Sequence, residues 1–370
     1  MAKWPSSLES MDMSAFCDFY RGRRVLVTGH TGFKGSWLML WLQTLGAKVT
    51  GLALDPDTKP SHWDALQLKD VNDYRVDLRD AQAVHTVLQE QQPEIIFHLA
   101  AQPLVRRSYD MPIDTFSTNV MGLIHLLEAV RNCPSVRVVI NATTDKVYAE
   151  QTCEEGYREN SPLGGHDPYS SSKACAELIS ECWRKSFFAS AEPAVRLATV
   201  RAGNVIGGGD WATDRLVPDL VRASITGKVL MVRQPNAIRP WQHVLEPLSG
   251  YLRLGQLLWE DVNLVGAWNF GPGRVGEISV QQLSKNLAKH WGSIKIEHDG
   301  HPHPHEASVL RLNADAACTQ LGWSSVWSID ESLKRTACWY KEFYENQKIL
   351  SQQDLNAYIK TAKSLKMAWV

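Results

Sequence analysis

The stretch that decides the fold reads Arg24-Val25-Leu26-Val27-Thr28-Gly29-His30-Thr31-Gly32-Phe33-Lys34-Gly35. Its first five residues are mainly apolar, as expected of a strand that is buried on both faces of a parallel sheet. The glycines follow the spacing GxxGxxG, and the next ten residues have the apolar spacing of a helix. A glycine-rich turn between strand and helix lets backbone N–H groups approach a pyrophosphate at the positive end of the helix dipole. We therefore predict that Gly29, His30, Thr31, Gly32, Phe33, Lys34 and Gly35 form a dinucleotide-binding turn, with a purely structural turn as the alternative.

Strands and helices alternate outward from this turn. Apolar runs predict strands at 24–28, 48–54, 94–99, 136–140 and 198–201, and helical spacing predicts helices at 36–45, 81–91, 120–131 and 174–187. This alternation predicts an α/β fold, a Rossmann-like doubly wound parallel sheet with a smaller C-terminal substrate-binding lobe. The expected divisions are a dinucleotide-binding domain with the catalytic residues at 20–205, a lobe mainly at 206–350 with some segments returning to the sheet, and peripheral segments at 1–19 and 351–370.

Composition and charge exclude several classes of protein. The 370 residues include 39 Lys and Arg against 40 Asp and Glu, and a net charge of −1 offers no electrostatic footprint for nucleic acid or an anionic membrane. No apolar run approaches the roughly 20 residues that span a bilayer, and residues 1–20 lack the layout of a signal peptide. The seven cysteines are scattered, which favours reduced thiols in the cytoplasm over disulfides or zinc. Prolines separate the histidines of 301–305, so we expect no metal.

Acidic residues at strand ends indicate which dinucleotide binds. Asp55 follows the second strand, 20 residues after Gly35. A carboxylate there accepts hydrogen bonds from the ribose hydroxyls and repels a 2′-phosphate, so it favours NAD over NADP; an Asx turn before Pro56 is the alternative. Asp77 and Leu78 follow a short third strand and are expected to border the adenine, with a surface turn as the alternative.

Tyr169 and Lys173 form a YxxxK pair. Positions i and i+4 face the same side of a helix, so the phenol and the ammonium become neighbours. A free phenol has a pKa near 10 and is a poor base at neutral pH, whereas a nearby cation lowers that pKa. The pair therefore predicts a tyrosine base activated by lysine, and a chance surface pair is the alternative.

With these motifs the chain resembles the extended short-chain dehydrogenase/reductase family over nearly its whole length. The segments Leu99-Ala100-Ala101-Gln102 and Ser117-Thr118-Asn119-Val120 support the resemblance. The resemblance implies that NAD is contacted by Ala100, Ala101, Gln102, Asn119, Tyr169 and Lys173. It also implies that Thr144 supplies a hydroxyl that polarises the substrate oxygen.

Thr144-Asp145-Lys146 narrows the resemblance to the nucleotide-sugar 4,6-dehydratases, which carry Thr-Asp and a third acid here. Lysine in the third position is similar to the members that act on CDP-glucose. The stretches 102–106, 164–169, 201–211 and 239–244 agree. Asp145 and Lys146 are adjacent titratable groups at the carboxyl end of a strand, where open α/β sheets bind ligands. Such a pair suits an elimination, and a surface salt bridge is the alternative.

A nucleoside diphosphate needs cations in its pocket, and arginine offers a planar fork suited to phosphate. The expected substrate-binding residues are Gln102, Arg106, Asn204, Arg215, Arg239, Asn269, Arg274 and His305. Surface charge or turn chemistry is their shared alternative.

The resemblance implies an NAD-dependent lyase that converts CDP-glucose to CDP-4-keto-6-deoxyglucose. The steps are oxidation at C4, loss of water across C5–C6 and return of hydride to C6, with Thr144, Asp145, Lys146, Tyr169 and Lys173 as catalytic residues. The alternatives are a nucleotide-sugar epimerase, a dehydratase for another nucleotide sugar, and a non-catalytic NAD-binding sensor. A cytoplasmic homodimer or homotetramer that makes a deoxysugar for lipopolysaccharide O-antigen is expected by analogy.

Overall fold

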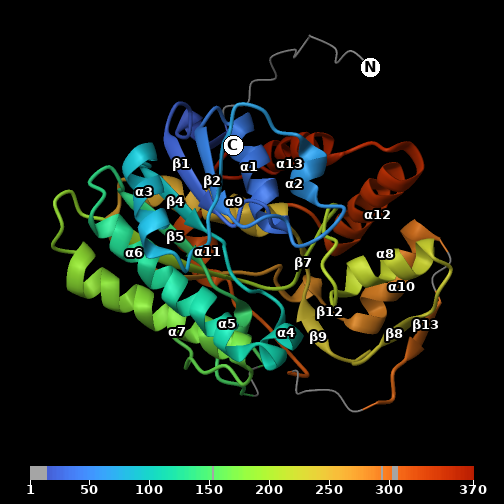
Figure 1. The fold of residues 1–370 in the computed structure, drawn as a ribbon. Coiled ribbons are helices and arrows are strands. Elements are labelled where there is room, and N and C mark those ends of the chain that lie inside the picture. Colours follow the sequence, from blue (N-terminus) through green and yellow to red (C-terminus); the bar gives the residue numbers. More distant parts are fainter. Residues whose placement is uncertain (1–14, 152–153, 293–294, 302–306) are drawn as a thin grey trace, which may run out of the picture.

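A seven-stranded sheet forms the centre of the computed structural model, which describes residues 15–151, 154–292, 295–301 and 307–370 (Figure 1). In spatial order its strands are β11 (Gly266–Phe270), β6 (Arg196–Ala202), β5 (Val138–Ala142), β4 (Ile95–His98), β1 (Arg24–Thr28), β2 (Lys48–Ala53) and β3 (Asn72–Arg75). All neighbouring strands run parallel. The predicted doubly wound α/β fold is thus confirmed. The strand order reverses between β1 and β4, and such a point in an open sheet is where ligands bind.

Helices cover both faces of this sheet. One face packs against α1 (Phe33–Thr44), α9 (Leu245–Leu258), α11 (Asp315–Leu321) and α13 (Ser351–Ser364); the other packs against α3 (Ala81–Gln91), α6 (Gly122–Arg131) and α7 (Pro168–Trp183). Successive residues of a strand point to opposite faces. Accordingly, Val25 and Val27 belong to the first core, whereas Leu26 belongs to the second.

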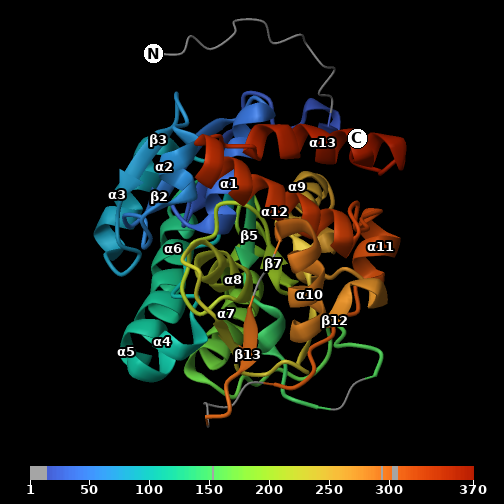
Figure 2. The ribbon, with the colours of Figure 1, turned by 90° about the vertical axis from the view of Figure 1, so that its right-hand side faces the viewer.

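A smaller lobe lies beside the carboxyl edge of the sheet, in yellow, orange and red in Figure 1 and from a second side in Figure 2. Its helices are α8 (Leu216–Ile225), α10 (Val280–Trp291) and α12 (Ile329–Asn346). Its short strands pair as β7 (Val205–Ile206) with β10 (Gln242–His243), β9 (Ile238–Pro240) with β12 (Glu277–Ser279), and β8 (Leu230–Val232) with β13 (Ile296–His298). Three further helices are short: α2 (His62–Leu66), α4 (Val105–Asp110) and α5 (Pro112–Phe116). The segment predicted as the lobe also supplies β11 to the main sheet.

The C-terminal segment differs from the expectation that residues 351–370 are peripheral. In α13, Tyr358 and Ile359 belong to a helical apolar stripe that is buried in the main core. Beyond it, the ring of Trp369 stacks on Phe16 with centroids 5.2 Å apart, and the Phe16 N–H donates to the Trp369 carbonyl at 2.6 Å. Residues from both supposedly peripheral segments therefore close one end of the core. Within the described residues, no helix combines the length and the apolar character that crossing a membrane requires.

Candidate active site

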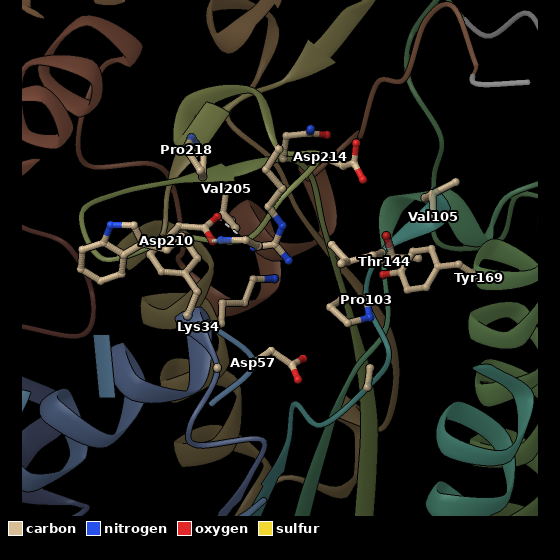
Figure 3. Close-up of a pocket in the computed structure, with 18 of the residues that line it drawn as sticks. Lys34, Asp57, Pro103, Val105, Thr144, Tyr169, Val205, Asp210, Asp214 and Pro218 are labelled. Atoms are coloured by element: carbon tan, nitrogen blue, oxygen red, sulfur yellow. Dashed lines mark hydrogen bonds and ion pairs between the residues drawn. The ribbon is translucent and has the colours of Figure 1, made fainter. Parts of the chain in front are cut away.

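A cavity of about 740 Å³ opens where β1, β4, β5 and β6 end and the lobe begins (Figure 3). Its wall contains residues of the glycine-rich turn, the 144–146 segment, α7 and the lobe. The sequence-predicted residues from four distant parts of the chain therefore meet in one cavity.

Close backbone contacts require glycine at two positions of the turn, and the third glycine leaves the cavity wall open. Gly29 has φ +73°, and a Cβ there would lie 2.6 Å from the Ala100 nitrogen. A Cβ on Gly35 would lie 2.1 Å from the Gly29 oxygen, so only glycine lets α1 start so close to the turn. Gly32 lines the cavity, and its Cβ would meet only the Gly29 oxygen, at 3.4 Å. This open cradle at the beginning of α1 fits a pyrophosphate.

His30 is the member of the turn that does not line the cavity, contrary to expectation. Its ring is fully buried beneath the turn, with Nε2 2.8 Å from an oxygen of Asp73 on β3. The ring of Trp63 contacts it edge to face at 4.5 Å, and a Cβ on Gly51 would lie 2.3 Å from it. His30 thus joins the turn to β2 and β3.

The acidic residues predicted for the adenosine end both line the cavity, together with Leu78. The Asp55 side chain is 88% exposed and lies 3.7 Å from the Nε of Arg75. Asp77 accepts hydrogen bonds from Arg79, which lower its pKa.

Ala100 and Ala101 also line the cavity, but Gln102 and Asn119 do not. Asn119 accepts from the Gln102 N–H at 2.8 Å and donates to the Gln102 carbonyl at 3.1 Å and to Ser172 Oγ at 2.9 Å. These buried amides fasten the loop after β4 to α7. These side chains support the cavity wall from behind. A sequence motif cannot distinguish that supporting role from direct contact with a ligand.

Tyr169 and Lys173 lie one turn apart on α7, and both line the cavity. The Tyr169 hydroxyl points towards Thr144 (Figure 3), and burial raises the pKa of Tyr169 to about 12, although the hydrogen bond with Thr144 lowers it. Burial lowers the pKa of Lys173 to about 8, and the nearby Lys34 lowers it too. Lys173 Nζ donates to the Ala142 carbonyl at 2.9 Å. In this structure the tyrosine pKa therefore moves in the opposite direction from the one predicted, because desolvation outweighs the hydrogen bond with Thr144 and the charge of Arg215.

Asp145 and Lys146 both line the cavity, just beyond the end of β5. Asp145 is 3% exposed, so the alternative of a surface salt bridge does not hold for it. Burial raises its pKa, against the effect of Lys146 and the hydrogen bond from Thr144. Its Oδ2 has no hydrogen-bond partner among the described residues.

The residues predicted to bind substrate divide into two groups. Arg106, Asn204, Arg215 and Arg239 line the cavity, and Arg215 donates to Asp210 at 2.9 Å. The other described residues of the set are Gln102, Asn269 and Arg274, which do not line it.

Asn269 is buried behind the site. It accepts from Tyr148 Oη at 2.6 Å and donates to the Tyr157 carbonyl at 2.9 Å. Arg274 lies exposed on the surface. His305 lies outside the described residues.

Six other charged residues that line the cavity were not predicted from the sequence: Asp57, Asp210, Asp214, Asp219, Arg233 and Asp299. Asp57 lies two residues beyond Asp55, and Asp210 follows three glycines, so both had a local signal. No local pattern distinguishes Asp214 or Arg233, because only the tertiary fold brings them to the cavity. In the part of the chain that the structure describes, no group of three His, Cys, Asp or Glu side chains is arranged to hold a metal ion.

Comparison with known proteins agrees with this geometry. The family model described as GDP-mannose 4,6 dehydratase matches residues 26–336. A CDP-glucose 4,6-dehydratase of Salmonella typhimurium is 47% identical over 350 residues, which cover 92% of this chain and 98% of that one. A dTDP-glucose 4,6-dehydratase of Haemophilus influenzae is 25% identical over 85% of this chain and 97% of its own. Among solved structures, a Thermus thermophilus UDP-glucose 4-epimerase in complex with NAD has a TM-score of 0.74 at 25% identity and covers 86% of this chain and 99% of its own.

Proposed function

The chain belongs to the GDP-mannose 4,6-dehydratase family of nucleotide-sugar dehydratases, and from this premise we propose that it is a hydro-lyase that converts CDP-glucose to CDP-4-keto-6-deoxyglucose with bound NAD. The observation that carries the proposal is its identity to a CDP-glucose 4,6-dehydratase along nearly the whole of both chains. The meeting of Thr144, Asp145, Lys146 and Tyr169 in one cavity supports it.

The glycine-rich turn would hold the pyrophosphate of NAD, and Asp55 would hold the adenosine ribose. Bound NAD would supply hydride chemistry, as an acceptor for the hydrogen of C4 and a donor to C6. The protein would hold the cofactor through a full catalytic cycle, with its pyrophosphate in the cradle between Gly29 and Gly35.

Tyr169 would take the proton of the C4 hydroxyl. To act as a base, Tyr169 must first be deprotonated. Burial opposes this because it raises the pKa of Tyr169 to about 12. Arg215 and the hydrogen bond with Thr144 both favour the phenolate. Thr144 would also hydrogen-bond the C4 oxygen and keep it in line with the Tyr169 oxygen.

Asp145 and Lys146 would share the elimination. Once C4 is a ketone, the C5 proton is acidic, and one group removes it while the other protonates the departing C6 hydroxyl. Burial raises the pKa of Asp145, which favours its protonated form and therefore the role of acid. Lys146 would then act as the base.

An epimerase needs Tyr169 and Lys173 but not an acid and a base beside C5 and C6. The burial of Asp145 against the cavity favours the dehydratase, because a carboxyl group without a task would rarely be left desolvated there. A non-catalytic NAD-binding sensor would need neither the Tyr169–Lys173 pair nor the Asp145–Lys146 pair.

Apolar side chains that are exposed on α5, on α7 and in the segments flanking α5 favour a homodimer. The exposed residues there include Met111, Ile113, Phe116, Met121 and Leu178, and Ile113 is 81% exposed. A second copy could cover them by pairing helices across a two-fold axis, as contiguous apolar patches of this kind usually mark interfaces. We propose a cytoplasmic homodimer or dimer of dimers that contributes a deoxysugar to surface polysaccharide.

The test is turnover of CDP-glucose by the NAD-loaded protein, followed by mass spectrometry and compared with dTDP-, GDP- and UDP-glucose. Loss of one water, fastest with CDP-glucose, is expected. Isomerisation at unchanged mass would instead indicate an epimerase, and faster loss of water from another sugar nucleotide would reassign the base.

A further inference from the structure

A buried carboxylate lies one helical turn beyond the catalytic residues of α7. Glu177 follows Lys173 by four residues, as Lys173 follows Tyr169, so the three side chains share one side of the helix. Glu177 is 5% exposed and, unlike the other two, does not line the cavity. It can therefore act on the reaction only through other residues.

Both oxygens of Glu177 bind the two strands that end beside the catalytic residues. Oε1 accepts hydrogen bonds from Thr143 Oγ1 at 2.5 Å and from Arg201 Nε at 2.8 Å. Oε2 accepts from Thr199 Oγ1 at 2.6 Å and from Arg201 Nη2 at 2.9 Å. Thr143 directly follows β5, and the other two residues belong to β6. One carboxylate thus fastens α7 to β6 and to the end of β5.

Arg201 extends this network to the far side of residues 144–146, the catalytic segment. Its Nη1 donates to Tyr148 Oη at 2.8 Å. Thr143, immediately before the catalytic segment, is bound by Glu177, and Tyr148, two residues after the segment, is bound by Arg201. The ion pair therefore holds both flanks of the catalytic segment, and its carboxylate belongs to the helix that carries the catalytic tyrosine and lysine.

Stability alone does not require this pair. Glu177 and Arg201 are 5% and 3% exposed, and a buried ion pair often contributes no more stability than apolar side chains of similar volume. The bidentate contact instead provides geometry, because a planar guanidinium and a carboxylate meet in one defined arrangement. This contact fixes the distance between α7 and β6.

We propose that the Glu177–Arg201 pair is a clamp that sets the position of the catalytic segment against the tyrosine and the lysine of α7. The α7 side of the clamp aligns the oxidation, and the Tyr148 side aligns the acid and the base of the elimination. All three are positioning residues, because none of them lines the cavity. This inference rests on the proposed function for the two steps of the reaction, but not for the identity of the nucleotide.

Tyr148→Phe loosens only one side of the clamp. It removes the hydroxyl that Arg201 binds but keeps the ring, which stacks on Tyr157 at 4.8 Å. Elimination should slow roughly tenfold while oxidation changes little, because displacing reacting groups by even about 1 Å is costly. Reduced nicotinamide should therefore accumulate in a single turnover, whereas the Kd of CDP should stay unchanged.

Tyr358→Phe is the matched control for this variant. It also removes a buried hydroxyl from a buried carboxyl group, that of Glu246 at 2.7 Å, and neither residue lines the cavity. It should accumulate no more reduced nicotinamide than the wild type.

Glu177→Gln opens the clamp at its centre. It keeps the volume of the side chain but removes the charge that pairs with Arg201. We expect kcat to fall roughly ten- to a hundredfold at unchanged Kd of CDP, because the cavity wall is kept whereas the alignment of the reacting groups is lost. Glu246→Gln, which also changes a buried carboxyl group, should leave kcat unchanged. If Glu177→Gln does not fold, Tyr148→Phe still decides.

The measurement combines stopped-flow absorbance of bound nicotinamide, kcat and calorimetric titration with CDP, all on the NAD-loaded protein. Turnover is measured with the sugar nucleotide that the wild type dehydrates fastest. Accumulation of reduced nicotinamide in Tyr148→Phe but not in Tyr358→Phe supports the clamp, since a merely structural contact would not slow one step more than the other. Parent rates in Tyr148→Phe, or equal slowing of both steps, overturn the inference and leave the proposed function intact. A wild type that removes water from none of the four sugar nucleotides overturns both.

Discussion

Tyr169 is the residue on which the oxidation step depends most directly. Tyr169→Phe keeps the ring and its packing but removes the oxygen that hydrogen-bonds with Thr144. We expect turnover to fall by at least about 10²-fold, the lower range for loss of a general acid or base. The measurement is kcat with CDP-glucose, with Tyr74→Phe on β3 as the control that should retain activity. Near-normal turnover by Tyr169→Phe would assign the base elsewhere.

Lys146 should separate elimination from oxidation. Lys146→Ala leaves Tyr169 and Thr144 in place, so hydride should still leave C4, whereas removal of the C5 proton should stall. Reduced nicotinamide should therefore accumulate in a single turnover, which stopped-flow absorbance measures directly. Tyr169→Phe is the matched comparison and should accumulate none. If Lys146→Ala loses water at the parent rate, Lys146 takes no part in elimination.

At the scale of elements, His62 links three helices. It starts α2, and its ring nitrogens lie 2.8 Å from Ser36 Oγ of α1 and 2.7 Å from Ser351 Oγ of α13. Burial lowers the pKa of His62 to about 3. The folded state therefore keeps the ring neutral while the unfolded chain binds a proton below its ordinary pKa of about 6.5, so this contribution to stability is present above pH 6.5 and is lost as the pH falls.

His62→Gln retains a donor and an acceptor but does not titrate. The free energy of unfolding of the variant should fall less steeply below pH 6.5, by up to about 1.4 kcal/mol per pH unit. Urea unfolding at pH 8, 6 and 5 measures the difference, and the comparison at pH 8 separates any constant loss of packing. Parallel stability curves over this range would contradict the assignment.

The burial of Trp369 belongs to the scale of the whole molecule, because it joins the two ends of the described chain. Its side chain is 1% exposed and packs against Phe16, Trp41 and Tyr358. Trp369→Ala should lower the free energy of unfolding by about 3–5 kcal/mol. Leu365→Ala, at a residue 54% exposed, is the control and should change it by less than about 0.5 kcal/mol. An equally small decrease in the free energy of unfolding in both variants would mean that the packing of Trp369 does not stabilise the fold.

The sequence predicted those parts of the fold and the site that depend on local pattern. The parallel sheet follows from alternating apolar runs and helical spacing, and the glycine-rich turn follows from contacts between close neighbours in sequence. The sequence could not distinguish a side chain that lines a cavity from one that is buried behind the cavity wall. For this reason His30 and Asn269 were expected to contact the ligand. Nor could it find the meeting of Arg106 with Asp214, which depends on how the lobe sits against the sheet.

The contact between Phe16 and Trp369 has a consequence for synthesis of the chain. The apolar side of α1, with Trp37 and Trp41, is buried partly by α13 and Trp369. These later segments leave the ribosome more than 300 residues after α1. At about 5–20 residues per second this interval lasts on the order of tens of seconds. For that time the nascent chain presents an aromatic surface that its own later segments will bury. Newly made protein should therefore depend on a chaperone that shields this surface until translation ends.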